Sequence, residues 1–242
     1  MDSLSRMIGI FDLFDGDRTV VTVEEVAAAL ECSIPTAYRY LKTLSTAGLI
    51  APDIQGGFGL GARIIQLDRQ IRLNDPLLHR AGAVMSRLIR EIRGNLMVCA
   101  SYGKNVVCIA QAWPDQTVMT SYDRGRPMPL LRGAAGKAIL AHLPDHRLRS
   151  LMLAHAAEIA AAGLGRDWTE FRKTLKAIRK QGYSVSVGEV DERNAGIAAP
   201  ILSPEKRAIG CLVLVVPRTE LDEANIPDIA SKLIAGAREI SG

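Results

Sequence analysis

The sequence of 242 residues predicts an α+β fold made of two domains. Two observations carry this prediction. Short amphipathic helices occupy most of residues 1–75, and in the rest of the chain helices gather between groups of strands that include a hairpin. This grouping favours an antiparallel sheet over a doubly wound parallel one. We place the domain boundary at Asp75-Pro76, because the residue before a proline avoids helical geometry.

Two helices are expected in the first thirty residues. Apolar residues recur at helical spacing between Leu4 and Phe14, and the turn residues Asp15-Gly16-Asp17 end that pattern. Thr22 and Glu25 have the spacing of a capping box, which predicts a second helix that runs to about Leu30.

A third helix is expected only three residues further on, and this short gap is typical of a helix-turn-helix. Ser33 is expected to cap the helix, Pro35 is tolerated in its first turn, and Gly48 closes it. The expected core stripe of this helix consists of Ile34, Ala37, Leu41 and Leu44.

A strand at 49–51, a turn at 53–57 and a return strand at 58–60 predict a wing after the third helix. The helix expected at 62–74 is more apolar than a lone helix needs, since Ile65 and Leu73 lie off its main apolar face. Two interpretations stay open: a helix packed on its own domain, or a linker helix that also dimerises the protein.

The second domain is expected to begin with a long amphipathic helix at 77–92 and a hairpin of strands at 96–101 and 106–112. Further strands are expected at 117–121, 183–188, 196–202 and 209–216, and further helices at 134–143, 145–162, 168–181 and 226–240.

The charge distribution limits how DNA binding can be argued. The net charge is +4, but residues 1–75 hold seven Lys and Arg against ten Asp and Glu, a balance of −3. Since attraction to phosphates is screened over about 10 Å, the placement of Arg39 and Lys42 matters more than the total.

The face of the third helix opposite its core stripe is polar and cationic and lacks any acid. Arg39 can bind guanine O6 and N7, or a phosphate, in bidentate fashion. The alternative is an ordinary solvated face. The candidate DNA-binding residues are Ser33, Pro35, Thr36, Tyr38, Arg39, Lys42 and Thr43.

The run Arg132 to Lys137 leads directly into a helix. Free N–H groups near Gly133 and Ala134 would lie at the positive end of the helix dipole, where a ligand carboxylate can bind. The alternative is that the glycines of this loop serve only close packing.

Membrane and secretory classes do not fit the sequence. The longest apolar run, Cys211 to Val216, is far short of a membrane span, and the first ten residues lack the order of a secretion signal. We therefore expect a cytoplasmic protein. The four cysteines, Cys32, Cys99, Cys108 and Cys211, are too far apart for zinc knuckles, and neither zinc nor disulfides are expected.

No catalytic residue, cofactor or metal is expected. Two stretches that imitate nucleotide-binding loops, 57–62 and 131–138, lack the residues or the preceding strand that such loops need. His142 and His146 have helical spacing, but Pro144 lies between them. One alternative from another class stays open: a metabolite-binding enzyme whose N-terminal helices only mediate oligomerisation.

Four runs of sequence resemble the IclR family of transcriptional regulators: VEEVAAALECSIPTAYRYLKTLSTAGLI at 23–50, PLLRGAAGKAIL at 129–140, GYSVSVGEVDERNAGIAAPI at 182–201 and GCLVLVV at 210–216. The resemblance implies a winged helix-turn-helix DNA-binding domain at 1–61, a linker helix at 62–75 and a GAF-like effector-binding domain at 76–242. It further implies dimers, or dimers of dimers, on a roughly palindromic double-stranded operator.

The resemblance also implies where a small-molecule effector binds. The loop around Gly133 forms one wall of the family's pocket, and Val213 and Val215 stand on a strand that carries polar residues in some relatives that bind small hydrophilic acids. Because these two residues are apolar here, we expect a carboxylate with an apolar or aromatic body, as in the control of a catabolic operon. The expected effector-binding residues are Gly133, Ala134, Ala135, Ser186, Glu189, Gly196, Val213 and Val215.

Overall fold

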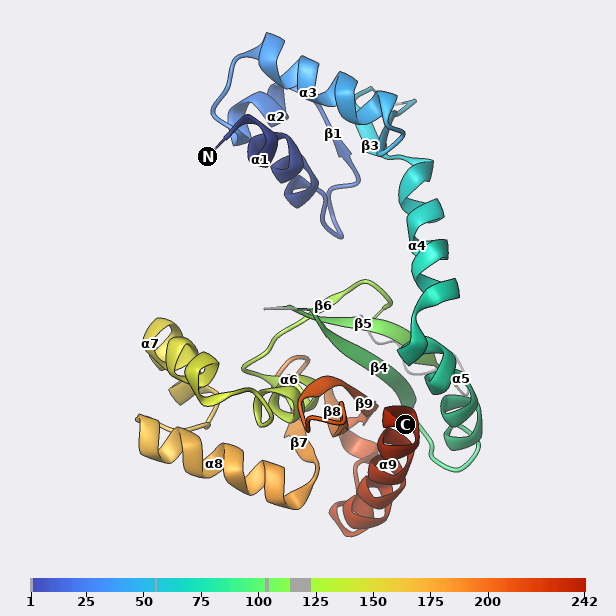
Figure 1. The fold of residues 1–242 in the computed structure, drawn as a ribbon, viewed down its shortest axis with the longest axis vertical. Coiled ribbons are helices and arrows are strands. Elements are labelled where there is room, and N and C mark those ends of the chain that lie inside the picture. Colours follow the sequence, from blue (N-terminus) through green and yellow to red (C-terminus); the bar gives the residue numbers. More distant parts are fainter. Residues whose placement is uncertain (1, 55, 103–104, 114–122) are drawn as a thin grey trace. The chain divides into compact units, whose positions relative to one another are not determined.

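The computed structural model describes residues 2–54, 56–102, 105–113 and 123–242 (Figure 1). The chain divides into two compact units, Met1–Asp75 and Pro76–Gly242. Each unit has its own apolar core, as expected for a chain of this length.

The first unit is a helix-turn-helix with a three-stranded antiparallel sheet. The sheet order is β1-β3-β2, and β2 and β3 form the hairpin predicted as a wing. The elements are α1 (Ser3–Ile8), the 3-10 helix η1 (Gly9–Leu13), β1 (Val20–Val21), α2 (Val23–Ala29), α3 (Ile34–Thr46), β2 (Ile50–Pro52), β3 (Phe58–Leu60) and α4 (Ala62–Asn74).

In the first unit, the predicted helix starts and ends agree with the structure with two exceptions. The capping box of Thr22 and Glu25 is confirmed, since each side chain bonds the other residue's backbone N–H. Ser33 occupies the N-cap position of α3 as predicted, but its hydroxyl bonds Thr36 Oγ1 at 3.0 Å and makes no capping hydrogen bond to the backbone. The predicted first helix changes to 3-10 geometry at Gly9.

The predicted core stripe of α3 is wrong at Ile34, which is 47% exposed. Tyr40 is buried together with Ala37, Leu41 and Leu44 in its place. Tyr40 can be buried because its hydroxyl bonds Ser3 Oγ at 2.9 Å, so its polar tip has a partner.

The helix α4 has the predicted bounds, and none of its residues is buried. Four of its large apolar side chains are 43–74% exposed, namely Ile65, Leu67, Ile71 and Leu73, and Ile64 is half-buried. Burial within its own unit therefore does not explain why this helix is apolar.

The second unit is built on one antiparallel sheet of order β6-β5-β4-β9-β8-β7, which confirms the α+β prediction. Its elements are α5 (Pro76–Leu88), β4 (Asn95–Tyr102), β5 (Asn105–Ala112), β6 (Pro127–Met128), α6 (Gly133–Leu140), α7 (Asp145–Ala161), α8 (Trp168–Gln181), β7 (Ser184–Val187), β8 (Asn194–Leu202), β9 (Ala208–Pro217), the 3-10 helices η2 (Arg218–Glu220) and η3 (Glu223–Asn225), and α9 (Ile226–Ser241).

Side chains alternate between the two faces of this sheet, and different helices cover each face (Figure 1). On β9, Leu212 and Leu214 point into the core formed with α5 and α9. Val213 and Val215 point to the opposite face, where they pack with the small residues of α6. The helices α7 and α8 add a third apolar cluster around Phe171.

Two predicted helices end earlier in the structure than expected. The helix expected at 77–92 begins at Pro76 and ends at Leu88, and the helix expected at 134–143 spans Gly133–Leu140. The two-residue strand β6 was not predicted, since it is too short to show alternation. The strand expected at 117–121 lies outside the described residues. Among the described residues, no helix combines the length and apolar character of a membrane span.

Candidate functional site

The exposed side of α3 is polar and carries no acidic residue. Of the seven residues predicted for this surface, six are exposed and Thr36 is half-buried. The opposite side of the helix is anchored in the core of the first unit through Leu41 and Leu44, which are 0% and 2% exposed. The fold therefore fixes which side of α3 can contact a partner.

Arg39 lies on this exposed side with its guanidinium carbon 5.9 Å from the centroid of the Tyr40 ring. A cation–π contact orients the side chain without using its N–H donors. Within the described residues, no protein group accepts a hydrogen bond from the Arg39 or Lys42 side chain. Their donors can therefore bond base edges or phosphates.

The hydroxyl groups of this surface are partly engaged. Thr43 donates its hydroxyl proton to the carbonyl oxygen of Arg39 at 2.9 Å, and the hydroxyls of Ser33 and Thr36 bond each other. In this conformation Thr43 has no hydroxyl proton left to donate to a phosphate. The cationic side chains are therefore the stronger candidates for contact with DNA.

The first turn of α6 is bonded by side chains from the strand β7 and the turn after it. Gly133 N–H donates to Glu189 Oε2 at 3.0 Å, and Ala134 N–H donates to Ser186 Oγ at 3.0 Å. Ser184 Oγ donates to the carbonyl oxygen of Ala134 at 2.6 Å. Ser184 and Ser186 lie two residues apart, so both face α6 from the same side of β7.

The expectation of free N–H groups at the start of α6 is therefore wrong. The side chains that bond Gly133 and Ala134 come from positions 56 and 52 residues later, which local sequence reading does not reveal. Lys137, one turn into the helix, donates to the other oxygen of Glu189 at 2.5 Å. One carboxylate already occupies the positive end of α6.

Close packing also explains both glycines of this loop. Gly133 has φ +75°, and a Cβ there would lie 2.7 Å from Val190 Cγ2. A Cβ on Gly136 would collide with the carbonyl oxygen of Pro129. Larger residues are therefore excluded from both positions.

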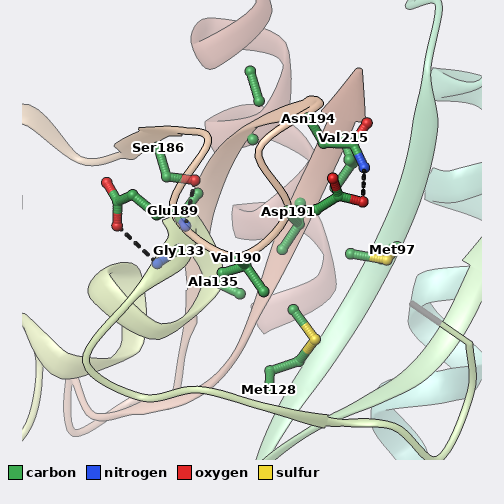
Figure 2. A pocket seen from close by; sticks show the side chains of 14 residues that line it. Met97, Met128, Gly133, Ala135, Ser186, Glu189, Val190, Asp191, Asn194 and Val215 are labelled. Atoms are coloured by element: carbon green, nitrogen blue, oxygen red, sulfur yellow. Dashed lines mark hydrogen bonds between the residues drawn. The ribbon is translucent and has the colours of Figure 1, made fainter. Parts of the chain in front are cut away.

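All eight residues predicted for effector binding line one cavity between α6, the sheet and the turn after β7 (Figure 2). On the sheet, Val213 pairs with Met97 of β4, and Val215 pairs with Gly196 of β8. The remaining residues that line the cavity are Met97, Met128, Val190, Asp191, Asn194 and Ala195.

Polar side chains line the cavity on more than one side, since Asp191 and Asn194 lie toward Met97 and away from Glu189 in Figure 2. Figure 2 shows Ser186 and Glu189 on one side and the two methionines across from them. The cavity leaves a volume of about 30 Å³ for a water-sized sphere, which is room for one or two waters. A larger ligand must therefore move side chains, and unbranched methionines adapt easily.

Some lining residues were missed by sequence reasoning. Met97 stands in a predicted strand on the same face as Cys99. This shared face was a signal from which Met97 could have been predicted to lie on the same side of the sheet as the cavity. Asp191 lies in the turn after β7 and Asn194 begins β8, and Asn194 Nδ2 donates to Asp191 Oδ2 at 3.1 Å. The side chain of Arg193, with its backbone N–H, lowers the pKa of Asp191 below its usual value.

The cysteines and potential metal ligands form no site among the described residues. No group of three or more His, Cys, Asp and Glu side chains there is placed to hold a metal ion. All four cysteines are free thiols. Cys108, Cys99 and Cys211 lie on neighbouring strands in the core behind the cavity.

Two family models match the chain. Residues 3–53 match the model described as "IclR helix-turn-helix domain", and residues 73–242 match "Bacterial transcriptional regulator IclR C-terminal". Among curated proteins, a probable HTH-type transcriptional regulator ArcR from Halobacterium salinarum is 26% identical over 98% of this chain and 91% of its own. The HTH-type transcriptional regulator KipR from Bacillus subtilis is 23% identical over 91% of this chain and 88% of its own.

Solved structures share the fold over nearly the whole chain. An IclR transcriptional regulator from Alicyclobacillus acidocaldarius superposes with a TM-score of 0.82 at 21% identity, covering 99% of this chain and 97% of its own. An IclR homologue from Microbacterium hydrocarbonoxydans, complexed with 4-hydroxybenzoate, gives a TM-score of 0.77 at 21% identity, with 99% of both chains covered.

Proposed function

Because the chain belongs to the IclR family of bacterial transcriptional regulators, we propose that α3 reads operator DNA and that the cavity beside α6 binds a carboxylate with an apolar or aromatic body. In this proposal residues 1–61 bind DNA, residues 62–75 link the domains, and residues 76–242 bind the effector. The family consists of transcription regulators, which favours this function over the enzyme alternative.

The exposed face of α3 supports the proposed DNA contact. A recognition helix enters the major groove with its polar side outward while its apolar side holds it on the domain. Arg39 and Lys42 have the exposure and the open donors that this role requires, and Ser33, Pro35, Thr36, Tyr38 and Thr43 flank them.

The single observation that carries the effector proposal is the composition of one cavity. The eight residues proposed to bind the effector line it together, with the carboxylate-bonding N–H of Gly133 at one end and an apolar wall at Val213 and Val215. Lys137, outside the lining, bonds the same carboxylate as Gly133. The complex of a structural neighbour with 4-hydroxybenzoate supports an aromatic acid as the class of effector. An operon for the breakdown of such an acid is the proposed target.

The exposed apolar side chains of α4 support a dimer. Ile65, Ile71 and Leu73 are about half exposed or more, and burying them against a second copy would remove apolar surface from water. A dimer would also present two α3 helices to a palindromic operator.

Calorimetry with a panel of acids tests the effector proposal. Benzoate and 4-hydroxybenzoate are expected to bind the full chain, while glyoxylate and pyruvate, which bring little apolar surface, are expected to bind weakly or not at all. Binding of the small hydrophilic acids alone would reject the proposed effector class.

A further inference from the structure

We propose that Glu189 is an internal competitor of the effector and thereby sets its specificity. Its carboxylate occupies the position that the effector's carboxylate takes, and effector binding displaces it. This inference rests on the proposed function, because it concerns the same cavity.

The contacts of Glu189 are those expected of a bound acid. One carboxylate oxygen accepts a hydrogen bond from Gly133 N–H at 3.0 Å (Figure 2). The other oxygen accepts from Lys137 Nζ at 2.5 Å. Together they engage the N-terminal end of α6 and the ammonium group of Lys137, which lies one turn along that helix beside the cavity. An incoming carboxylate finds the same two donors only if Glu189 leaves them.

The low exposure of Lys137 requires that another anion takes the place of Glu189 when Glu189 is displaced. The Lys137 side chain is only 11% exposed and that of Glu189 is 25% exposed. At this depth their attraction is screened less than at the surface, and an unpaired Lys137 would be poorly solvated. A neutral ligand cannot restore this pairing, so the displacing ligand carries an anionic group, which the proposed effector supplies as a carboxylate.

The turn that carries Glu189 lies outside the paired part of the sheet, because the pairing of β7 with β8 ends at Val187 and Ala195. Gly188 N–H donates to the carbonyl oxygen of Asn194 at 2.9 Å and closes the base of the turn between β7 and β8. Beyond this base, Glu189 and Val190 reach over to Gly133. Release of Glu189 into solvent would lift these two residues away from Gly133 and widen the narrow cavity.

This exchange explains how the cavity selects acids with an apolar body. One carboxylate replaces another, so the number of charged hydrogen bonds stays the same and gives little net affinity. The gain must come from apolar surface buried against Met97, Met128, Val213 and Val215. Since Glu189 is tethered nearby, its effective concentration is high, and small hydrophilic acids cannot compete with it.

The test compares Glu189→Ala with Glu192→Ala, a matched loss of one negative charge on an exposed residue of the same turn. Calorimetry on the full chain with 4-hydroxybenzoate and with acetate measures both affinities. Glu189→Ala is expected to bind each probe roughly tenfold tighter or more, with the larger gain for acetate, while Glu192→Ala behaves like the unaltered chain. Glu189→Gln, which keeps the side-chain shape, is expected to show the same direction.

Equal or weaker binding of both probes by Glu189→Ala and Glu189→Gln, relative to Glu192→Ala, would overturn the inference. If 4-hydroxybenzoate binds all variants equally, the effector class stands and the competition fails.

A second readout separates the two proposals when no aromatic acid binds. In protein labelled with ¹⁵N-glycine, the Gly133 amide of Glu189→Ala is expected to shift saturably with acetate, while that of the unaltered chain does not. A shift without any binding of aromatic acids supports the competition and rejects the aromatic effector. A Gly133 amide that does not respond in Glu189→Ala would overturn the competition.

Discussion

The buried hydroxyl of Ser184 donates a 2.6 Å hydrogen bond to the carbonyl oxygen of Ala134, which joins the edge strand β7 to the first turn of α6. Ser184 is 4% exposed, so neither group can bond bulk water instead. This bond fixes the wall of the cavity from which Ser186 and Glu189 extend.

Ser184→Ala is expected to destabilise the second unit by roughly 1–3 kcal/mol, because it leaves the Ala134 carbonyl buried without this donor. Chemical denaturation of the full chain measures the loss. Ser203→Ala is the control, since the Ser203 hydroxyl bonds Glu205 on the surface and its loss should change stability by less than about 0.5 kcal/mol. Equal effects would argue that the Ser184 bond is not structural.

The different burial of Leu41 and Ile34 on α3 predicts different costs of truncation. Leu41→Ala removes a side chain that is 0% exposed and is expected to cost about 2–5 kcal/mol. Ile34→Ala, at 47% exposure, is expected to cost under about 1 kcal/mol. Thermal and chemical unfolding compare the two variants, and a larger cost for Ile34→Ala would contradict the described packing of α3.

The buried thiol of Cys108 predicts a loss of stability at alkaline pH. The neighbouring Cys99 thiol and burial together raise the pKa of Cys108 well above its usual range, so the folded state keeps this proton. The unfolded chain releases it above about pH 8.5, so it binds fewer protons than the folded chain there, and stability falls as pH rises. The slope is up to about 1.4 kcal/mol per pH unit for one thiol.

Denaturation midpoints between pH 8 and pH 10 check this slope. Cys108→Ala is expected to lose less stability over that range than the unaltered chain, while Cys32→Ala, at a half-exposed position, is expected to follow it. Identical slopes for all three proteins would contradict a buried, protonated Cys108.

The apolar surface of α4 predicts a dimer that a single charge disrupts. Ile65→Glu, at a side chain 74% exposed in one copy, is expected to shift the full chain toward monomer in sedimentation experiments. Gln70→Glu is the control, since it adds the same charge at another exposed position of α4. This variant is expected to stay dimeric. A monomeric unaltered chain would reject the proposal.

The fold was largely predictable from sequence because its helices and strands carry clear periodic patterns. The apolar run at 211–216 predicts the strand β9, and the capping box of Thr22 is a local signal. That Leu212 and Val213 point into two different cores is seen only in the structure. Burial of Tyr40 was not predictable, because its hydroxyl partner Ser3 lies 37 residues away.

The candidate cavity was predictable as a set of residues but not as a geometry. Eight of the fourteen residues that line it follow from the family resemblance, while the bond from Gly133 to Glu189 joins positions 56 residues apart and depends on the turn after β7. The small volume depends on how Val190 packs against Gly133, which no spacing in the sequence encodes.

The most direct test of the account is the DNA affinity of Arg39→Ala, measured by anisotropy with DNA flanking the protein's own gene and with unrelated DNA. Specific binding is expected to weaken by about 1–3 kcal/mol, while binding of 4-hydroxybenzoate stays unchanged. Arg18→Ala, at an exposed arginine outside α3, is expected to keep its specificity. If Arg39→Ala binds the specific DNA as tightly as the unaltered chain does, that result would contradict the reading of DNA by α3.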